Sequence, residues 1–128
     1  MSYMFNKCSS LKELFFSNFN ICNVKNMSGM FNECFSLEEL NLSNFDSSKT
    51  QFMIGMFAGC YSLKFLDILN FNTNNVKNMS YMFYECTSLE EIIFSNFNTE
   101  NIDDMSYLFC KCLSIKKINV LTIKMFKI

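Results

Sequence analysis

The stretch "NMSYMFYECTSLEEIIFSNFNT", residues 78–99, decides the fold, because residues 26–47 read almost the same: "NMSGMFNECFSLEELNLSNFDS". The two stretches lie 52 residues apart and share most of their apolar positions, a Cys and several Ser. A Met-Phe pair and a Cys also recur halfway between them, at Met56, Phe57 and Cys60, so the basic period is 26 residues. Self-similarity at a fixed period predicts a repeat architecture.

The period holds along the whole chain without insertion or deletion. Each repeat has a Met or Leu directly before a Phe, and these residues are Met4, Met30, Met56, Met82 and Leu108. The Cys column reads Cys8, Cys34, Cys60, Cys86 and Cys112. The sequence therefore predicts one array over residues 1–128, made of the repeats 1–26, 27–52, 53–78, 79–104 and 105–128. One such unit cannot bury its apolar face alone, so each is expected to stack on its neighbours.

Two patterns within each repeat predict its secondary structure. Leu37, Leu40 and Leu42 follow the L-x-x-L-x-L signature of a leucine-rich repeat strand. Val24, Met27 and Met30 are spaced by three, which indicates one or two helical turns. We therefore expect an α/β repeat solenoid of the leucine-rich repeat class. Short parallel β-strands would line its concave face, and short helical turns would lie on its convex face.

Composition excludes several classes of function. The 128 residues carry a formal net charge of −1, which gives no electrostatic reason to expect a nucleic-acid partner. No apolar run approaches the roughly 18 residues that a membrane span requires. The first ten residues, "MSYMFNKCSS", lack a basic segment followed by an apolar run, so no secretory signal is visible in this chain.

The seven Cys residues do not predict a metal site. The five in-phase Cys would form a straight file along the stack, whereas zinc needs four ligands that converge on one point. Free Cys is among the most buried residue types, so we interpret this column as core filler. Cys22 and Cys110 lie off phase, and Cys110 with Cys112 gives only a C-x-C pair. No metal ligand and no cofactor is predicted.

The sequence also argues against an enzyme. The chain has no His, so a Ser-His or Cys-His nucleophile pair cannot form. Its paired carboxylates, such as Glu38 and Glu39, are adjacent in a predicted strand and need not converge on one bond. Three Gly residues supply no phosphate-binding loop. No catalytic residue is predicted.

These repeats resemble those of the BspA-like leucine-rich repeat surface proteins. The segment "MSYMFYECTSLEEIIFSNFNT" carries the resemblance: an aromatic residue, then Cys, then L-x-x-L/I, and then a V-x-x-M entry into the next unit. The resemblance covers all five repeats. It implies a curved array used for adhesion or other protein binding at cell surfaces, often secreted or lipid-anchored.

Positions expected to face solvent on the strands suggest a binding surface. One column alternates in charge, which predicts pairs of opposite charge between neighbouring strands: Lys12, Glu38, Lys64, Glu90 and Lys116. In a repeat protein, a recognition surface is expected at the exposed positions whose residues differ from repeat to repeat. The candidate binding surface consists of Phe15, Phe65, Asp67, Leu69 and Ile93.

The sequence thus predicts a non-catalytic, protein-binding or adhesion-type module with a protein partner of unknown identity. The alternative is a structural spacer array that self-associates through uncapped ends, where terminal strands would expose unpaired backbone. The location stays open between two settings. Seven Cys without a visible signal favour a reducing interior, whereas the resemblance points to the cell surface or secretion.

Overall fold

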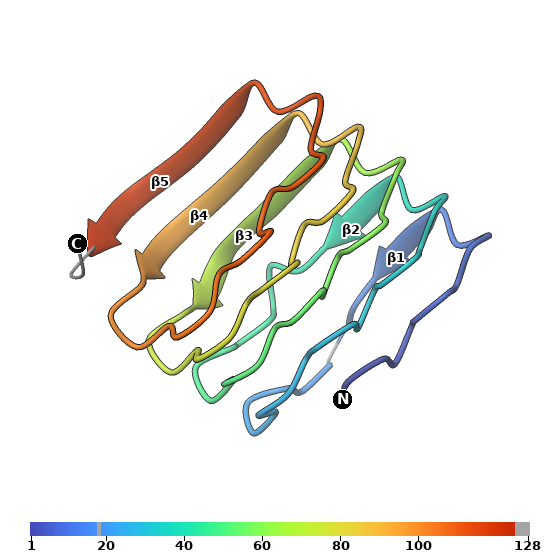
Figure 1. Ribbon diagram of the computed structural model, residues 1–128. Helices are drawn as coiled ribbons and strands as arrows, with labels where there is room; N and C mark the ends of the chain where they lie inside the picture. The colour runs from blue at the N-terminus through green and yellow to red at the C-terminus, as the bar shows by residue number, and fades with distance from the viewer. Residues whose placement is uncertain (18, 125–128) are drawn as a thin grey trace.

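The computed structural model describes residues 1–17 and 19–124, and within them the chain winds as a stack of coils. Five β-strands lie side by side in chain order on one side of the stack, and the connecting segments run back along the other side (Figure 1). The strands are β1 (Glu13–Phe15), β2 (Glu39–Asn41), β3 (Phe65–Asn72), β4 (Glu91–Asn98) and β5 (Lys117–Lys124). We call each coil a layer and number it by its strand.

The strands pair in parallel and in register with the repeat. Glu13 lies opposite Glu39, and Leu66 lies opposite Ile92, so paired residues are 26 positions apart. The pairing forms a two-stranded sheet, β1-β2, and a three-stranded sheet, β3-β4-β5. The strand side of the molecule is therefore divided between β2 and β3.

The other long side, here called the turn side, contains turns where the sequence predicted helices. It comprises residues 1–11, 27–37, 53–63, 79–89 and 105–115. Within the described residues the chain forms no helix. The prediction of an α/β leucine-rich repeat solenoid with helical turns on a convex face is therefore wrong.

Left-handed backbone explains why helices do not form. Each layer has positive φ angles at the third and seventh positions of its repeat, and a right-handed helix cannot pass through such a residue. Seven of these residues are not glycine: Tyr3, Lys7, Glu33, Tyr81, Glu85, Tyr107 and Lys111. The same two columns hold the three glycines of the chain, Gly29, Gly55 and Gly59.

The hydrogen bonds of the turn side alternate between two kinds of partner. In layer 2, the N–H of Phe31 donates to the carbonyl of Met56 in the next layer at 2.9 Å. The N–H of the following residue, Asn32, donates to Gly29, three residues earlier in its own turn, at 3.1 Å. The same pattern repeats through the stack, for example from Phe57 to Met82 at 2.9 Å. The backbone thus joins layer to layer instead of closing on itself as in a helix.

Aromatic rings continue this layering through the core. The rings of Phe5, Phe31, Phe57, Phe83 and Phe109 stack face to face with centroid separations of 5.6, 5.5, 5.5 and 5.1 Å. Offset stacking of this kind adds about 0.5–1.5 kcal/mol per pair beyond the area that the rings bury. The Met columns and the inward strand residues, such as Leu66 and Ile92, complete the buried core.

The sequence predicted that the whole Cys column fills the core, and the structure confirms this for the three central members, whereas Cys8 and Cys112 at the two ends are half-buried. Cys34, Cys60 and Cys86 are buried, and the thiol of each donates to a Phe carbonyl of the preceding layer, at 3.1–3.3 Å. All seven cysteines are free thiols. Burial raises the pKa of Cys34 to about 11 and raises the pKa of Cys60 and Cys86 as well, because a thiolate would be desolvated. The thiols therefore stay protonated and act as small apolar fillers.

Candidate functional site

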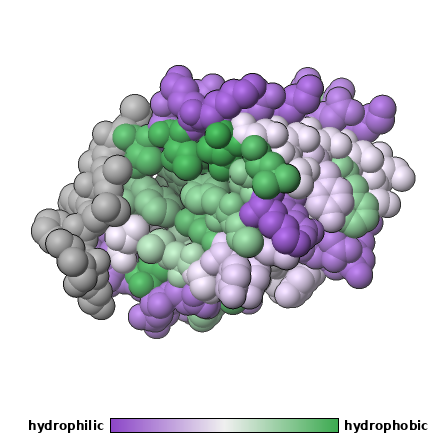
Figure 2. All heavy atoms as spheres, turned by 45° about the horizontal axis from the view of Figure 1, so that its top comes forward, coloured by the Kyte–Doolittle hydropathy of each residue, from purple (hydrophilic) through white to green (hydrophobic). Residues whose placement is uncertain are grey.

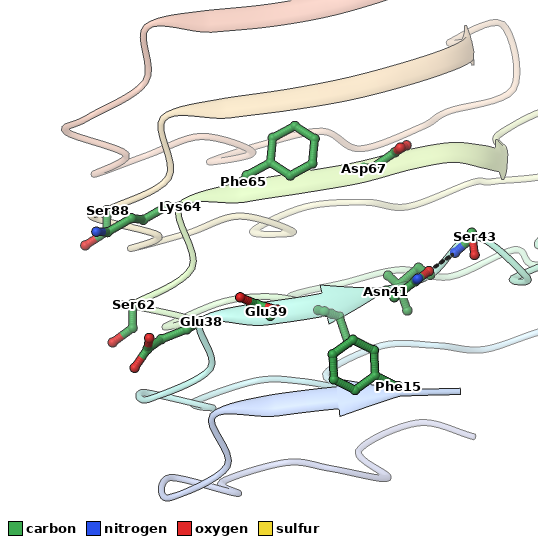
Figure 3. Close-up of a pocket in the computed structure, with 12 residues that line it drawn as sticks. Phe15, Glu38, Glu39, Asn41, Ser43, Ser62, Lys64, Phe65, Asp67 and Ser88 are labelled. Atoms are coloured by element: carbon green, nitrogen blue, oxygen red, sulfur yellow. Dashed lines mark hydrogen bonds between the residues drawn. The ribbon is translucent and has the colours of Figure 1, made fainter. Parts of the chain in front are cut away.

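A groove of about 920 Å³ crosses the outward face of β1, β2 and β3. Figure 3 shows that its side chains come from all three strands, from the segments that flank them and, at Ser88, from the turn before β4. The polar and aromatic residues that line it are Phe15, Glu38, Glu39, Asn41, Ser43, Ser62, Lys64, Phe65, Asp67 and Ser88.

The groove follows from the alternation of side chains along the strands. Successive strand residues point to opposite faces, so Leu66 and Ile68 enter the core while Phe65 and Asp67 face outward. On the outward face β2 carries Glu39 and Asn41, whereas the strands on either side of it carry Phe rings. Phe15 on β1 is 62% exposed and Phe65 on β3 is 48% exposed. The two rings therefore form walls around a polar floor.

The division of the sheet deepens this floor. Within residues 1–17 and 19–124, no backbone ladder joins β2 to β3. Side chains take the backbone groups instead: the Asn41 side-chain oxygen accepts the N–H of Ser43 at 2.9 Å, and the Asn70 amide donates to the Ser43 carbonyl. Such local side-chain bonds compete with strand pairing. Leu40 and Leu42 are buried yet line the groove, so it reaches the main chain of β2.

The groove carries an excess of negative charge. Three carboxylates line it, those of Glu38, Glu39 and Asp67, against the single ammonium of Lys64. Figure 3 shows Glu38, Ser62, Lys64 and Ser88 at the end where the strands begin, and Asp67 toward the other end. Three negative groups minus one positive group leave a formal charge of −2, which favours a cationic ligand.

The predicted charge column is only partly realised. Of its four steps, one is an ion pair among the described residues: Lys116 to Glu90 at 2.7 Å. Hydrogen bonding to Lys116 lowers the pKa of Glu90. Glu38 and Lys64 instead face the groove, where the sheet is divided. The steps from Lys12 to Glu38 and from Lys64 to Glu90 form no ion pair either among the described residues, although their strands are paired, so the carboxylates of the groove are left without a cation partner whether or not a ladder is present.

The structure brings together three of the five predicted surface residues. Phe15, Phe65 and Asp67 all line the groove. Leu69 and Ile93 are half-buried and are not among its lining residues.

Sequence reasoning missed the serines of the groove and Glu39. Ser62 belongs to an unbroken Ser column, and its hydroxyl donates to the Phe35 carbonyl of the layer below at 2.8 Å. That regular column was the available signal for Ser62 and Ser88. Glu39 carried no signal of its own, because the column it occupies also contains Glu13 and Glu91.

The two end layers expose apolar columns that the inner layers bury. Met4 is 50% exposed and Ile118 is 43% exposed, whereas Met30 and Leu66 of the same columns are fully buried. Figure 2 turns the top of Figure 1, where β5 lies, toward the viewer. On this face, apolar side chains gather around a hollow, and polar residues lie along its border.

Across the described part of the chain, no group of three or more His, Cys, Asp or Glu residues is placed to hold a metal ion. Over the same residues, no helix has the length and apolar character needed to cross a bilayer.

Comparisons with known proteins give one match. Residues 1–122 match the family described as "Mycoplasma protein of unknown function, DUF285". No curated protein and no solved structure matches the chain significantly.

Proposed function

Because the chain belongs to the DUF285 family, whose description assigns no activity, we propose its function from its own geometry: it is a non-catalytic module that binds a protein segment in the groove over β2. The single observation that carries this proposal is the pair of exposed rings, Phe15 and Phe65, on either side of a polar floor. Exposed aromatic residues around a concavity are the side chains that most often dominate protein interfaces.

The resemblance of the repeats to those of BspA-like surface proteins, which rests on sequence motifs and not on the fold, also favours binding over catalysis. It carries with it the proposal of an adhesion-type role at a cell surface. Localisation by antibody labelling of intact and permeabilised cells tests this part. Labelling that requires permeabilisation would contradict it.

Backbone NMR tests the binding proposal. The probe is a panel of synthetic nine-residue peptides of apolar, cationic and anionic composition, titrated into ¹⁵N-labelled protein. We expect the largest amide shift changes at Glu39–Asn41 and at the start of β3, because these segments form the groove floor and wall. Changes confined to the turn side, or no change with any peptide, would contradict the proposal.

The matched control compares two exposed aromatic residues. Phe65→Ser removes a groove wall, whereas Tyr107→Ser removes an exposed ring of layer 5 that stacks on Tyr81 at 4.8 Å. We expect the first change to weaken peptide binding about tenfold or more and the second to leave it unchanged. Equal effects would show that binding does not use the groove.

The exposed end layers favour a second candidate, self-association of the module end to end. Stacking layer 5 of one copy on layer 1 of another would bury the Met4 and Ile118 columns in the register used inside the chain. The same stacking would place Lys111 against Lys7 and Lys116 against Lys12, and like charges facing each other oppose it.

Light scattering over a concentration series tests this second candidate. The double variant Lys7→Glu and Lys12→Glu would replace both repulsive pairs by attractive ones. We expect this variant to associate more strongly than the unaltered chain, and less so at high salt because exposed charges are screened. A strict monomer in both cases would exclude the candidate for this chain.

A further inference from the structure

We infer that the ligand of the groove over β2 is an extended peptide that places an arginine side chain between Phe15 and Phe65, in the negative field of the carboxylates of Glu38, Glu39 and Asp67. The inference rests on the proposed function and specifies the chemistry of the partner. Three features of the groove lead to it: its charge, its aromatic walls and the main chain at its floor.

Charge selects a cation. The groove has a formal charge of −2, and its one ammonium, on Lys64, lies at the end where the strands begin (Figure 3). The four ion pairs of the described residues lie elsewhere and join layer 1 to layer 2 or layer 4 to layer 5. The carboxylates of Glu38 and Glu39 take part in none of them, so a ligand cation would meet them without first breaking a pair.

The aromatic walls favour arginine over lysine. A guanidinium is planar, is weakly hydrated and stacks on aromatic faces, whereas an ammonium is a compact and strongly hydrated point charge. Phe15 and Phe65 stand on the strands that flank β2, and both rings are exposed. The guanidinium can also donate two parallel hydrogen bonds to one carboxylate, a geometry that lysine cannot offer.

The floor of the groove favours an extended peptide. Buried Leu40 and Leu42 line the groove, and no ladder joins β2 to β3 in the described part of the chain, so β2 has an edge without a strand partner. Extended segments bind such edges through backbone hydrogen bonds while alternate side chains enter the pockets. Free arginine or a folded cationic surface would not align with that edge.

The experiment begins with an array of randomised nine-residue synthetic peptides probed with the labelled full chain. The strongest binders are resynthesised with each Arg replaced by citrulline, which keeps the shape of the side chain and removes its charge. Affinities are measured by fluorescence polarisation for the unaltered protein, for Phe15→Ser with Phe65→Ser, and for Glu38→Gln with Glu39→Gln. The control variant is Glu100→Gln, an exposed carboxylate outside the groove.

The expected result is an enrichment of Arg at one fixed position. Citrulline at that position should weaken binding to the unaltered protein about tenfold or more, and by less than about twofold in the Glu38→Gln, Glu39→Gln variant, because the two changes remove the same interaction. The Glu100→Gln control should behave like the unaltered protein. Far-UV circular dichroism of each variant confirms that the fold is retained.

Two different outcomes would overturn the inference. Peptides that lose affinity in the Phe variant but carry no Arg preference would refute the arginine ligand and leave the groove as a binding site. An array without any binder that responds to the Phe variant would refute the proposed function as well.

Discussion

The turn side and the strand side of this molecule are built from the same five repeats, yet only the turn side is continuous. On the turn side, backbone hydrogen bonds and stacked Phe rings run without interruption from layer 1 to layer 5. On the strand side, the ladders stop between β2 and β3, and the groove lies there. One side holds the layers together, and the other is free to vary.

The difference teaches where a repeat protein of this kind can place a function. Turn-side residues are fixed by their contacts with two neighbouring layers, so a change in one column disturbs the whole stack. Outward strand residues contact fewer neighbours, and Asn41 and Asp67 can even bond their own backbone. The cost of breaking the ladder is therefore local, and the resulting groove leaves the core intact.

The largest expected effect comes from the central ring of the turn side. Phe57→Ala should lower the free energy of unfolding by about 3–5 kcal/mol, since Phe57 is fully buried between Phe31 and Phe83. Phe65→Ala, on the strand side, should cost less than about 1 kcal/mol because the ring is largely exposed. Urea unfolding followed by circular dichroism measures both. Similar losses for the two variants would break the comparison between the sides.

Alkaline pH should destabilise the stack through its buried thiols. Their pKa values are raised above the ordinary value of 9.0, so the folded state keeps protons that the unfolded state loses. The stability they provide is complete below pH 9 and falls as the pH rises toward about 11 for Cys34 and Cys112, and beyond that for Cys60 and Cys86. Each thiol adds a slope of at most about 1.4 kcal/mol per pH unit.

The control for this pH dependence is Cys60→Ala. Urea unfolding under reducing conditions, from about pH 8 to about pH 11, measures the free energy of unfolding of both proteins. This free energy should fall less steeply with pH in the variant, by up to about 1.4 kcal/mol per pH unit. Every other titratable group is common to both proteins, so the difference between the two slopes reports on Cys60. Identical slopes would mean that Cys60 does not stay protonated in the folded state.

The sequence predicts which residues lie side by side, but not the shape of the turn side. A constant period of 26 places Glu13 beside Glu39 and Leu66 beside Ile92, because equivalent positions of stacked units must align. The prediction of helical turns was wrong because the three-residue spacing of Val24, Met27 and Met30 also suits turns closed by hydrogen bonds to the third residue back. Glycine was the overlooked signal: all three lie in the two left-handed columns.

The groove was predictable in part. Phe15, Phe65 and Asp67 stood out because outward strand positions alternate with core positions, and a period of two fixes their direction. The break between β2 and β3 was not predictable, because Asn41 and Asp67 both accept the N–H two residues further on, and yet β3 pairs with β4 while β2 does not pair with β3. Leu69 and Ile93 were included in the predicted binding surface because the position of the break, and therefore of the groove, could not be predicted.

Glycine substitutions sharpen the comparison on the turn side. Gly55→Ala should cost about 1–2 kcal/mol, since its φ of +56° is unfavourable for a residue with a Cβ, whereas the new Cβ would meet only the Ala58 Cβ at 3.7 Å, an ordinary van der Waals contact. Gly29→Ala should cost slightly more, because the new Cβ would also overlap the ring of Tyr3, and this exposed side chain would have to rotate away. Urea unfolding measures both, and a neutral Gly55→Ala would contradict the left-handed turn.

The smallest expected change in stability, and the most direct test of the divided sheet, comes from Asn41→Ile. Layer 4 has Ile93 at this position, and β4 pairs with strands on both sides. The substitution removes the hydrogen bond from the Ser43 N–H to the Asn41 side chain, so β2 should lengthen and pair with β3.

We expect the free energy of unfolding to change by less than about 1 kcal/mol. Hydrogen exchange should slow for the amides of Phe65–Ile68, and the groove should narrow. Asn119→Ile, in β5 and away from the break, is the control. Unchanged exchange in Asn41→Ile would mean that side-chain competition at layer 2 does not divide the sheet.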